Sequence, residues 1–225
     1  MSPSGFSRSL RLAVGALLLC LPQAAHAQRL LYDTAPPPDA ALLRFVNGTD
    51  KALTVQSSGP DAAALPDRLA GFETSSYVVL KPGADYRFTF GNGAIVYDYR
   101  GKASEKLTVV LTGLSEPAFY EVDDSSLRMT SEAQLNFYNA APTCSSAGLR
   151  LGGTTTDVFA DVAPGTARQR LVNPVEAPVD AVCDGKQPAS VGLKGLKAGQ
   201  SFSLFLLGTG GRTLTLVPDS IRTHG

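Results

Sequence analysis

The sequence predicts an all-β protein made of two tandem β-sandwich domains of similar topology, of the Ig-like or jelly-roll type. Almost every apolar segment is short, alternates with polar residues and ends at Gly, Pro, Asn or Asp, which is typical of β-strands. The first half holds about seven such segments, the number of strands in a small Ig-like sandwich. The phrase LRFVN at residues 43–47 returns as LNFYN at residues 135–139, 92 positions later, so we expect the architecture to occur twice.

The strands of the first half follow one another closely, with turn residues between them. Asn47-Gly48 and Pro82-Gly83 mark two of the turns, because Gly readily takes a positive φ and Pro presets φ for a tight turn. The expected strands are residues 41–47, 51–56, 75–80, 85–90, 94–99, 106–112 and 118–122.

The second half repeats the order of these segments. In each copy of the phrase, we expect Leu and Phe to face the core, while Asn47 and Asn139 have the structural role of closing the strand. The chain is therefore divided into a domain at 28–124, a linker at 125–132 and a domain at 133–225. The matched segments are ALLRFVN (41–47) with AQLNFYN (133–139), VLKPGAD (79–85) with DVAPGTA (161–167), and KLTVVLTGLS (106–115) with SFSLFLLGTG (201–210).

The N-terminal segment, residues 1–27, has the pattern of a cleaved secretory signal peptide. Arg8 and Arg11 flank the start of an apolar stretch, Leu12–Leu21, and Ala25–Ala27 supplies a small-x-small cleavage site. That stretch is too short for a permanent membrane anchor, and no later segment is long and apolar enough to span a bilayer. We therefore expect a mature chain, starting at Gln28, that lies outside the cytoplasm and does not span the membrane.

Two cysteines, Cys144 and Cys183, remain after the signal peptide is removed. In an oxidising compartment, two cysteines most simply form one disulfide. A reactive thiol pair is the alternative, but the spacing is not the CxxC of redox-active pairs. The second domain is therefore expected to contain one structural disulfide.

Composition argues against several classes of function. The formal net charge is zero, without the concentrated basic face of a nucleic-acid-binding protein. His224 is the one histidine of the mature chain, and its position beside the C-terminus suits neither a catalytic base nor a zinc ligand. We expect no catalytic residues, no metal and no cofactor.

An adjacent carboxylate pair, Asp123-Asp124, lies near the expected junction of the two domains. Neighbouring residues of a strand point to opposite faces, so the two carboxylates are not expected to share one site. We expect a solvated turn here, and calcium binding is the alternative.

The densest aromatic feature is a predicted hairpin. One strand of it places three aromatic residues on one face, and the other places an Ile and two tyrosines on one face. A stack of this kind packs into a core or offers a platform for sugar rings, and charged residues on the opposite face favour the core. The residues are Tyr86, Phe88, Phe90, Ile95, Tyr97 and Tyr99.

A basic segment in the second domain is the candidate contact surface. Arg168 and Arg170 are expected on one face of a strand, where two guanidinium groups bind a carboxylate well. Asn173 and Pro174 end that strand. The alternative is an ordinary solvated strand face.

The chain resembles the AlgF family, periplasmic accessory proteins of alginate O-acetylation. The resemblance lies in LLYDTAPPPDAALLRFVN (30–47), AQLNFYN (133–139) and RQRLVNPV (168–175). It implies a secreted, β-rich, non-catalytic protein that works beside periplasmic and membrane acetyltransferase components. Only structural or interaction residues correspond, namely Asn47, Asn139, Arg170, Asn173 and Pro174.

Three functions follow as hypotheses. The first is a non-catalytic adaptor in the O-acetylation of a secreted, alginate-like exopolysaccharide. The second is a module that binds an anionic polysaccharide through the aromatic hairpin and the two arginines. The third is an Ig-like chaperone or structural module that donates or accepts an edge strand.

Overall fold

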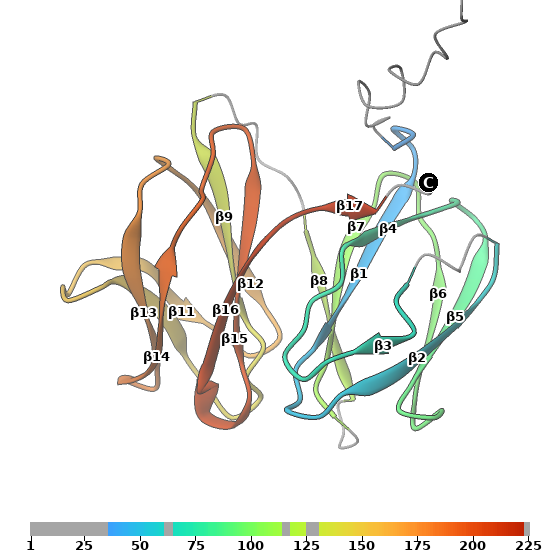
Figure 1. The fold of residues 1–225 in the computed structure, drawn as a ribbon, viewed down its shortest axis with the longest axis horizontal. Helices are drawn as coiled ribbons and strands as arrows, with labels where there is room; N and C mark the ends of the chain where they lie inside the picture. Colours follow the sequence, from blue (N-terminus) through green and yellow to red (C-terminus); the bar gives the residue numbers. More distant parts are fainter. Residues whose placement is uncertain (1–35, 61–64, 114–117, 125–130, 223–225) are drawn as a thin grey trace, which may run out of the picture. The chain divides into compact units, whose positions relative to one another are not determined.

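The computed structural model describes residues 36–60, 65–113, 118–124 and 131–222 (Figure 1). Residues Thr34–Gly225 belong to one compact unit. The predicted signal peptide, most of the predicted linker and His224 lie outside the described residues. Within the described ranges, no helix is long and apolar enough to cross a membrane.

Strands from the first half form two sheets. One sheet has the order β4-β1-β7-β8, with β17 (Ile221–Arg222) from the second half added beside β4, and the other has the order β3-β2-β5-β6. β1 runs parallel to β7 and antiparallel to β4. The strands are β1 (Ala41–Asn47), β2 (Leu53–Ser58), β3 (Arg68–Leu69), β4 (Tyr77–Leu80), β5 (Asp85–Phe90), β6 (Ile95–Arg100), β7 (Lys106–Leu111) and β8 (Phe119–Asp123).

Strands from the second half form two further sheets, ordered β12-β9-β15-β16 and β11-β10-β13-β14. Apart from β17, each order repeats that of the first half with the strand numbers raised by eight, and β9 runs parallel to β15 as β1 does to β7. The strands are β9 (Ala133–Asn139), β10 (Ala147–Leu151), β11 (Asp157–Val162), β12 (Ala167–Val172), β13 (Ala177–Cys183), β14 (Lys186–Leu193), β15 (Ser201–Leu207), β16 (Thr213–Pro218) and β17 (Ile221–Arg222), with the 3-10 turn η2 (Thr209–Gly211) before β16.

The prediction of an all-β fold with two sandwiches of similar topology is therefore confirmed. One detail of the repeat was wrong. The Pro-Gly turn at Pro82-Gly83 joins β4 to β5, whereas the one at Pro164-Gly165 joins β11 to β12, the equivalents of β3 and β4. Each of these turns connects strands of different sheets. Gly83 and Gly165 have φ of 77° and 70°, and any tight turn accommodates a Pro-Gly pair, so the pair does not identify one particular connection.

Each sandwich encloses its own apolar core. The aromatic hairpin, now β5 and β6, points inward, so its packing in a core is confirmed and the sugar platform is not what its rings form. Phe45 of β1 lies at the centre of these rings, with its centroid 4.9 Å from those of Phe88 and Phe90. The buried side chains of the hairpin are Tyr86, Phe88, Phe90, Ile95, Tyr97 and Tyr99.

β1 and β9 are buried on both faces. In β1, Leu43 and Phe45 face the first core, while Val46 belongs to a third cluster that also contains Tyr138 of β9 and Phe205 of β15. This cluster joins the β1–β7 sheet to the β9–β15 sheet. A strand covered on both faces has no solvent side, so the polar residues Arg44, Gln134 and Asn136 of these two strands are buried as well.

Asn47 and Asn139 end these two strands in the same way. Each side chain is buried and donates from Nδ2 to a backbone carbonyl of the following loop: Asn47 to Lys51 at 2.7 Å, and Asn139 to Cys144 at 2.8 Å. Buried loop carbonyls need such partners, because leaving one unpaired is costly.

The last described strand crosses from the second half to the first (Figure 1). β17 pairs in parallel with β4, and the Tyr77 amide donates to the Ser220 carbonyl at 2.8 Å. β17 therefore covers the outer edge of β4 at Tyr77 and Val78. The domain ranges 28–124 and 133–225 stay a prediction.

Candidate functional site

The strongest cluster of charged groups lies between the two facing sheets and is centred on Arg44 of β1. Its side chain is 1% exposed. Arg44 Nη1 donates to Asp219 Oδ1 at 2.6 Å, and Nε donates to Thr108 Oγ1 at 2.6 Å. Nη2 donates to Tyr138 Oη at 2.9 Å and to Ser203 Oγ at 2.8 Å. One arginine thus contacts strands of both sandwiches.

A second carboxylate, Asp124, closes the cluster from the end of β8. It accepts hydrogen bonds from the hydroxyls of Tyr77 and Tyr138, each at 2.5 Å, and from the hydroxyl of Thr108. The guanidinium of Arg44 lies 3.6 Å away. Asp124 is therefore buried, with its charge balanced by Arg44, and the prediction of a solvated turn at this residue was wrong.

The neighbouring Asp123 is exposed. The two carboxylates face different surroundings, as expected from the alternation of side chains along a strand. Asp124 is buried because its side of β8 is covered by the facing sheet, which strand alternation within one domain does not reveal.

Aromatic rings sandwich the buried charge. The guanidinium carbon of Arg44 lies 4.4 Å from the ring centroid of Tyr77 and 5.1 Å from that of Phe205. Lys106 Nζ lies 4.6 Å from the Tyr77 centroid and 3.8 Å from Asp219 Oδ2. These cation–π contacts favour a desolvated charge.

The pKa shifts show which charge states the cluster favours. Burial alone would raise the pKa of Asp219, but Arg44, the Ser201 hydroxyl and Lys106 together lower it below its ordinary 3.8. Burial opposes ionisation of Arg44 as well, yet its pKa is raised overall by the nearby tyrosine and aspartate groups. The pKa of Lys106 is lowered, chiefly by burial. The cluster is thus most stable with Arg44 and Asp219 ionised.

The geometry makes this cluster a joint between sheets. Its central groups are nearly inaccessible to solvent and each is hydrogen-bonded within the cluster. The sequence contained one overlooked signal: Arg44 stands inside ALLRFVN, a run that is otherwise almost entirely apolar and therefore typical of a strand covered on both faces.

The basic segment predicted as a contact surface lies elsewhere, on the edge strand β12. Arg168 and Arg170 are exposed. Asn173, Pro174 and Val175 follow the strand and are exposed too, with Val175 at 55%. The segment therefore presents two cations and an apolar side chain along one sheet edge.

The register of β12 places both arginines on the same side. Arg168 pairs with Phe137 and Arg170 with Leu135, and side chains of directly paired residues share a face of the sheet. Phe137 and Leu135 point into the second core. The two arginine side chains therefore lie on the core-facing side of β12, at the edge of the second sandwich. There Arg170 Nη1 donates to the Val158 carbonyl of β11 at 2.9 Å.

The buried joint and this edge adjoin. A cavity of about 40 Å³ is lined by Asp124 and Tyr138 of the joint and by Arg168 of β12. Gln134 extends the polar contacts between them, because its Nε2 donates to Asn136 Oδ1 at 2.7 Å and to Gln169 Oε1 at 2.8 Å.

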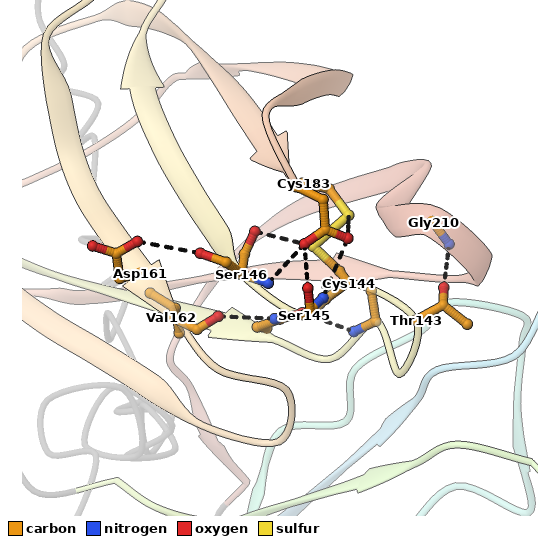
Figure 2. Close-up of a disulfide and its surroundings, with 11 residues drawn as sticks. Thr143, Cys144, Ser145, Ser146, Asp161, Val162, Cys183 and Gly210 are labelled. Carbon is orange, nitrogen blue, oxygen red and sulfur yellow. Dashed lines mark hydrogen bonds between the residues drawn. A yellow bond between two sulfur atoms is a disulfide. The ribbon is translucent and has the colours of Figure 1, made fainter.

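The predicted disulfide joins Cys144 to Cys183, whose Cα atoms are 5.4 Å apart. Figure 2 shows it beside a network of polar side chains. Asp184 Oδ1 accepts from the Ser145 hydroxyl at 2.6 Å and from the Ser146 amide at 3.0 Å, and these hydrogen bonds lower the pKa of Asp184. The bridge therefore fixes the loop after β9 to the end of β13.

Comparisons with known proteins give structural likenesses of limited extent. No family model and no curated protein matches the sequence. Among solved structures, the chain is similar to the C-terminal domain of AlgF from P. aeruginosa: 24% identity and a TM-score of 0.35, over 40% of this chain and 99% of that one. It is also similar to the family CBM26 module of Eubacterium rectale Amy13K in complex with maltoheptaose: 12% identity and a TM-score of 0.27, over 79% of this chain and 96% of that one. These scores are low, so the likenesses carry no conclusion about function.

Proposed function

We propose that this chain is a non-catalytic accessory protein in the O-acetylation of a secreted, alginate-like exopolysaccharide. It acts in the periplasm, after removal of residues 1–27, by binding acetyltransferase components. The sequence resemblance to the AlgF family supplies the pathway, and the structure supports a role in binding.

The observation that carries the proposal is the position of the segment RQRLVNPV (168–175). This segment belongs to the resemblance, and it lies along an exposed sheet edge with Arg168 and Arg170 pointing to the same side. By contrast, the first-strand phrases of the resemblance are buried and serve the joint and the cores. Exposed charged residues on a rigid strand are available to a partner, and arginine is enriched at protein interfaces.

The buried charge cluster supports a binding role indirectly. Arg44, Asp124 and Asp219 are used to hold two sheets together, which makes the pair of sandwiches a rigid scaffold. A rigid scaffold loses little conformational entropy when it binds a partner.

Affinity capture tests the proposal. The tagged chain is expressed with its signal peptide in the bacterium that naturally makes it. It is captured from the periplasm and from detergent-solubilised membranes, and its partners are identified by mass spectrometry. We expect acetyltransferase components to be recovered with the wild-type chain and lost with Arg168→Ala plus Arg170→Ala.

A matched control removes the same number of charges elsewhere. Arg87 and Arg100 are exposed on the first sandwich, each in an exposed ion pair, and such pairs contribute little to stability. Arg87→Ala plus Arg100→Ala should leave capture unchanged. Acetyl transfer by the purified mature chain alone would contradict the non-catalytic role.

A second candidate is binding of the anionic polysaccharide by Arg168 and Arg170. The exposure and spacing of the two arginines favour it, while the inward packing of the aromatic hairpin removes the sugar platform from this hypothesis. It predicts retention of the wild-type chain on immobilised polyuronate that weakens with salt. Retention equal to that of the Arg168→Ala, Arg170→Ala variant would exclude this candidate.

A further inference from the structure

The internal repeat allows one sheet edge to be compared with its equivalent. β4 and β12 occupy the same place in the two sandwiches, next to β1 and β9. The outer edge of β4 is covered by β17, which adds a short parallel strand. Among the described residues, no strand pairs with the outer edge of β12.

The register shows which backbone groups of β12 face outward. The Asn139 amide donates to the Thr166 carbonyl at 3.0 Å, and hydrogen-bonded pairs recur at every second residue of an antiparallel ladder. The amide and carbonyl of Arg168 and Arg170 therefore face β9, whereas those of Ala167 and Leu171 face away from it. Leu171 is the equivalent of Val79 on the edge that β17 covers.

The two edges also differ in the side chain at an equivalent core-facing position. Leu43 of β1 pairs with Val78, and its equivalent in β9, Leu135, pairs with Arg170. Val78 is 2% exposed and belongs to the first core, whereas Arg170 is exposed. The uncovered edge thus carries a cation at the position where the covered edge carries an apolar residue.

We propose that β12 accepts an extended strand from a partner protein, with acidic side chains at alternate positions. The strand lies parallel to β12, as β17 lies on β4, and one of its carbonyls accepts from the Leu171 amide. Its acidic side chains stand beside Arg168 and Arg170, because neighbouring strands place paired side chains on one face. This inference rests on the proposed function in one respect, namely that the donor strand belongs to an acetyltransferase component.

The contrary explanation is that the charges only protect the edge. Charged side chains and proline commonly keep edge strands from pairing with other chains, and Arg168, Arg170 and Pro174 fit that role. The two explanations differ in whether an acidic strand binds β12 at all, so a defined probe separates them.

The test uses two synthetic peptides and the mature chain with its disulfide intact. The probe is acetyl-Thr-Val-Glu-Val-Glu-Val-Thr-amide, and the control replaces both Glu by Lys. Backbone chemical shifts and amide exchange are followed by NMR. We expect the Glu peptide to shift the amides of β12 and to slow exchange at Ala167 and Leu171, and the Lys peptide to leave them unchanged.

Variants test the two parts of the contact. Arg168→Ala plus Arg170→Ala should weaken binding of the Glu peptide by about tenfold or more, and Arg87→Ala plus Arg100→Ala should not weaken it. Leu171→Pro removes an outward amide without touching the ladder to β9 and should abolish binding. If Leu171→Pro does not fold, Arg170→Val serves instead, since it restores the residue type of the first copy.

The outcomes separate this inference from the proposed function. Absence of shifts at β12 would show that the edge is only protected, and equal binding of the Glu and Lys peptides would show that the arginines do not select an acidic strand. Either result would overturn the inference. Capture of acetyltransferase components by the Leu171→Pro or Arg170→Val variant at the wild-type level would overturn the docking edge and leave the accessory function standing. Peptide binding at β12 without any such capture by the wild-type chain would uphold the edge and refute the proposed function.

Discussion

At the scale of single residues, Arg44 and Asp219 hold the facing sheets together. They stand 175 positions apart in the chain and form a buried ion pair at 2.6 Å. A buried charge is tolerated only when it is paired and hydrogen-bonded. The other donors of Arg44 bind Thr108, Tyr138 and Ser203. Removing the arginine is expected to lower the stability of the fold mainly because buried carboxylates would remain without a counter-charge.

Replacing Arg44 by Leu is therefore expected to lower the free energy of unfolding by about 3–5 kcal/mol, because Asp219 and Asp124 lose their buried counter-charge. Urea unfolding of the mature chain measures this change. The control is Arg87→Leu, which removes an exposed arginine and should change the free energy by less than about 1 kcal/mol. Equal effects of the two substitutions would show that the joint does not depend on Arg44.

The lowered pKa of Asp219 makes the stability of the joint depend on pH in the acid range. Because this pKa is lower in the folded chain than its ordinary 3.8, the folded state binds fewer protons than the unfolded state around that pH. The resulting stability is complete above about pH 4 and is lost as pH falls through the folded pKa. Asp219→Asn should flatten the fall of the urea midpoint between about pH 5 and pH 2. Asp98→Asn is the surface control, since the pKa of Asp98 is also lowered but the group is exposed. If Asp219→Asn left the pH dependence of the urea midpoint unchanged, the acid sensitivity could not be attributed to Asp219.

At the scale of strands, the sequence predicted most of the fold. Alternation located the longer strands of the first half to within a few residues. In the second half, the repeat located β9 and β15, whereas β10, β13 and β14 were not identified individually. β3 was missed, since a two-residue strand (Arg68–Leu69) has no measurable period. The two Pro-Gly turns were matched although they join non-equivalent strands, because turn chemistry is local and is the same at any tight turn.

The candidate sites were predicted unevenly. Arg168 and Arg170 were identified because two cations at alternate positions of a strand are visible in the sequence. The joint around Arg44 was not, because its partners Asp124 and Asp219 come from distant segments. Asp124 is brought near Arg44 by the pairing of β7 with β8 in the same sheet, and Asp219 by the segment between β16 and β17.

The disulfide acts at the level of the strands it joins. It closes a loop with a sequence separation of 39 residues between β9 and the end of β13, which restricts the unfolded chain and is expected to stabilise the fold by about 3–4 kcal/mol. Cys144→Ala plus Cys183→Ala should lower the urea midpoint accordingly. A midpoint equal to that of the wild type would mean that the bridge contributes nothing to stability.

At the scale of the whole molecule, the two sandwiches share one strand order but have different surfaces. The first strand of each copy is buried between sheets, and β17 covers the edge of β4. The equivalent edge, β12, carries exposed arginines instead. We infer that one copy completes the scaffold and the other provides the surface on which a partner docks.

The central claim, an accessory role in exopolysaccharide acetylation, is tested most directly by the acetyl-ester content of the polymer that the cells secrete. Cells lacking this chain should secrete the polymer in normal amount with its acetyl esters greatly reduced. The wild-type chain and the Arg87→Ala, Arg100→Ala variant should restore the esters, while the Arg168→Ala, Arg170→Ala variant should not. Unchanged acetyl content in cells without the chain would contradict the claim.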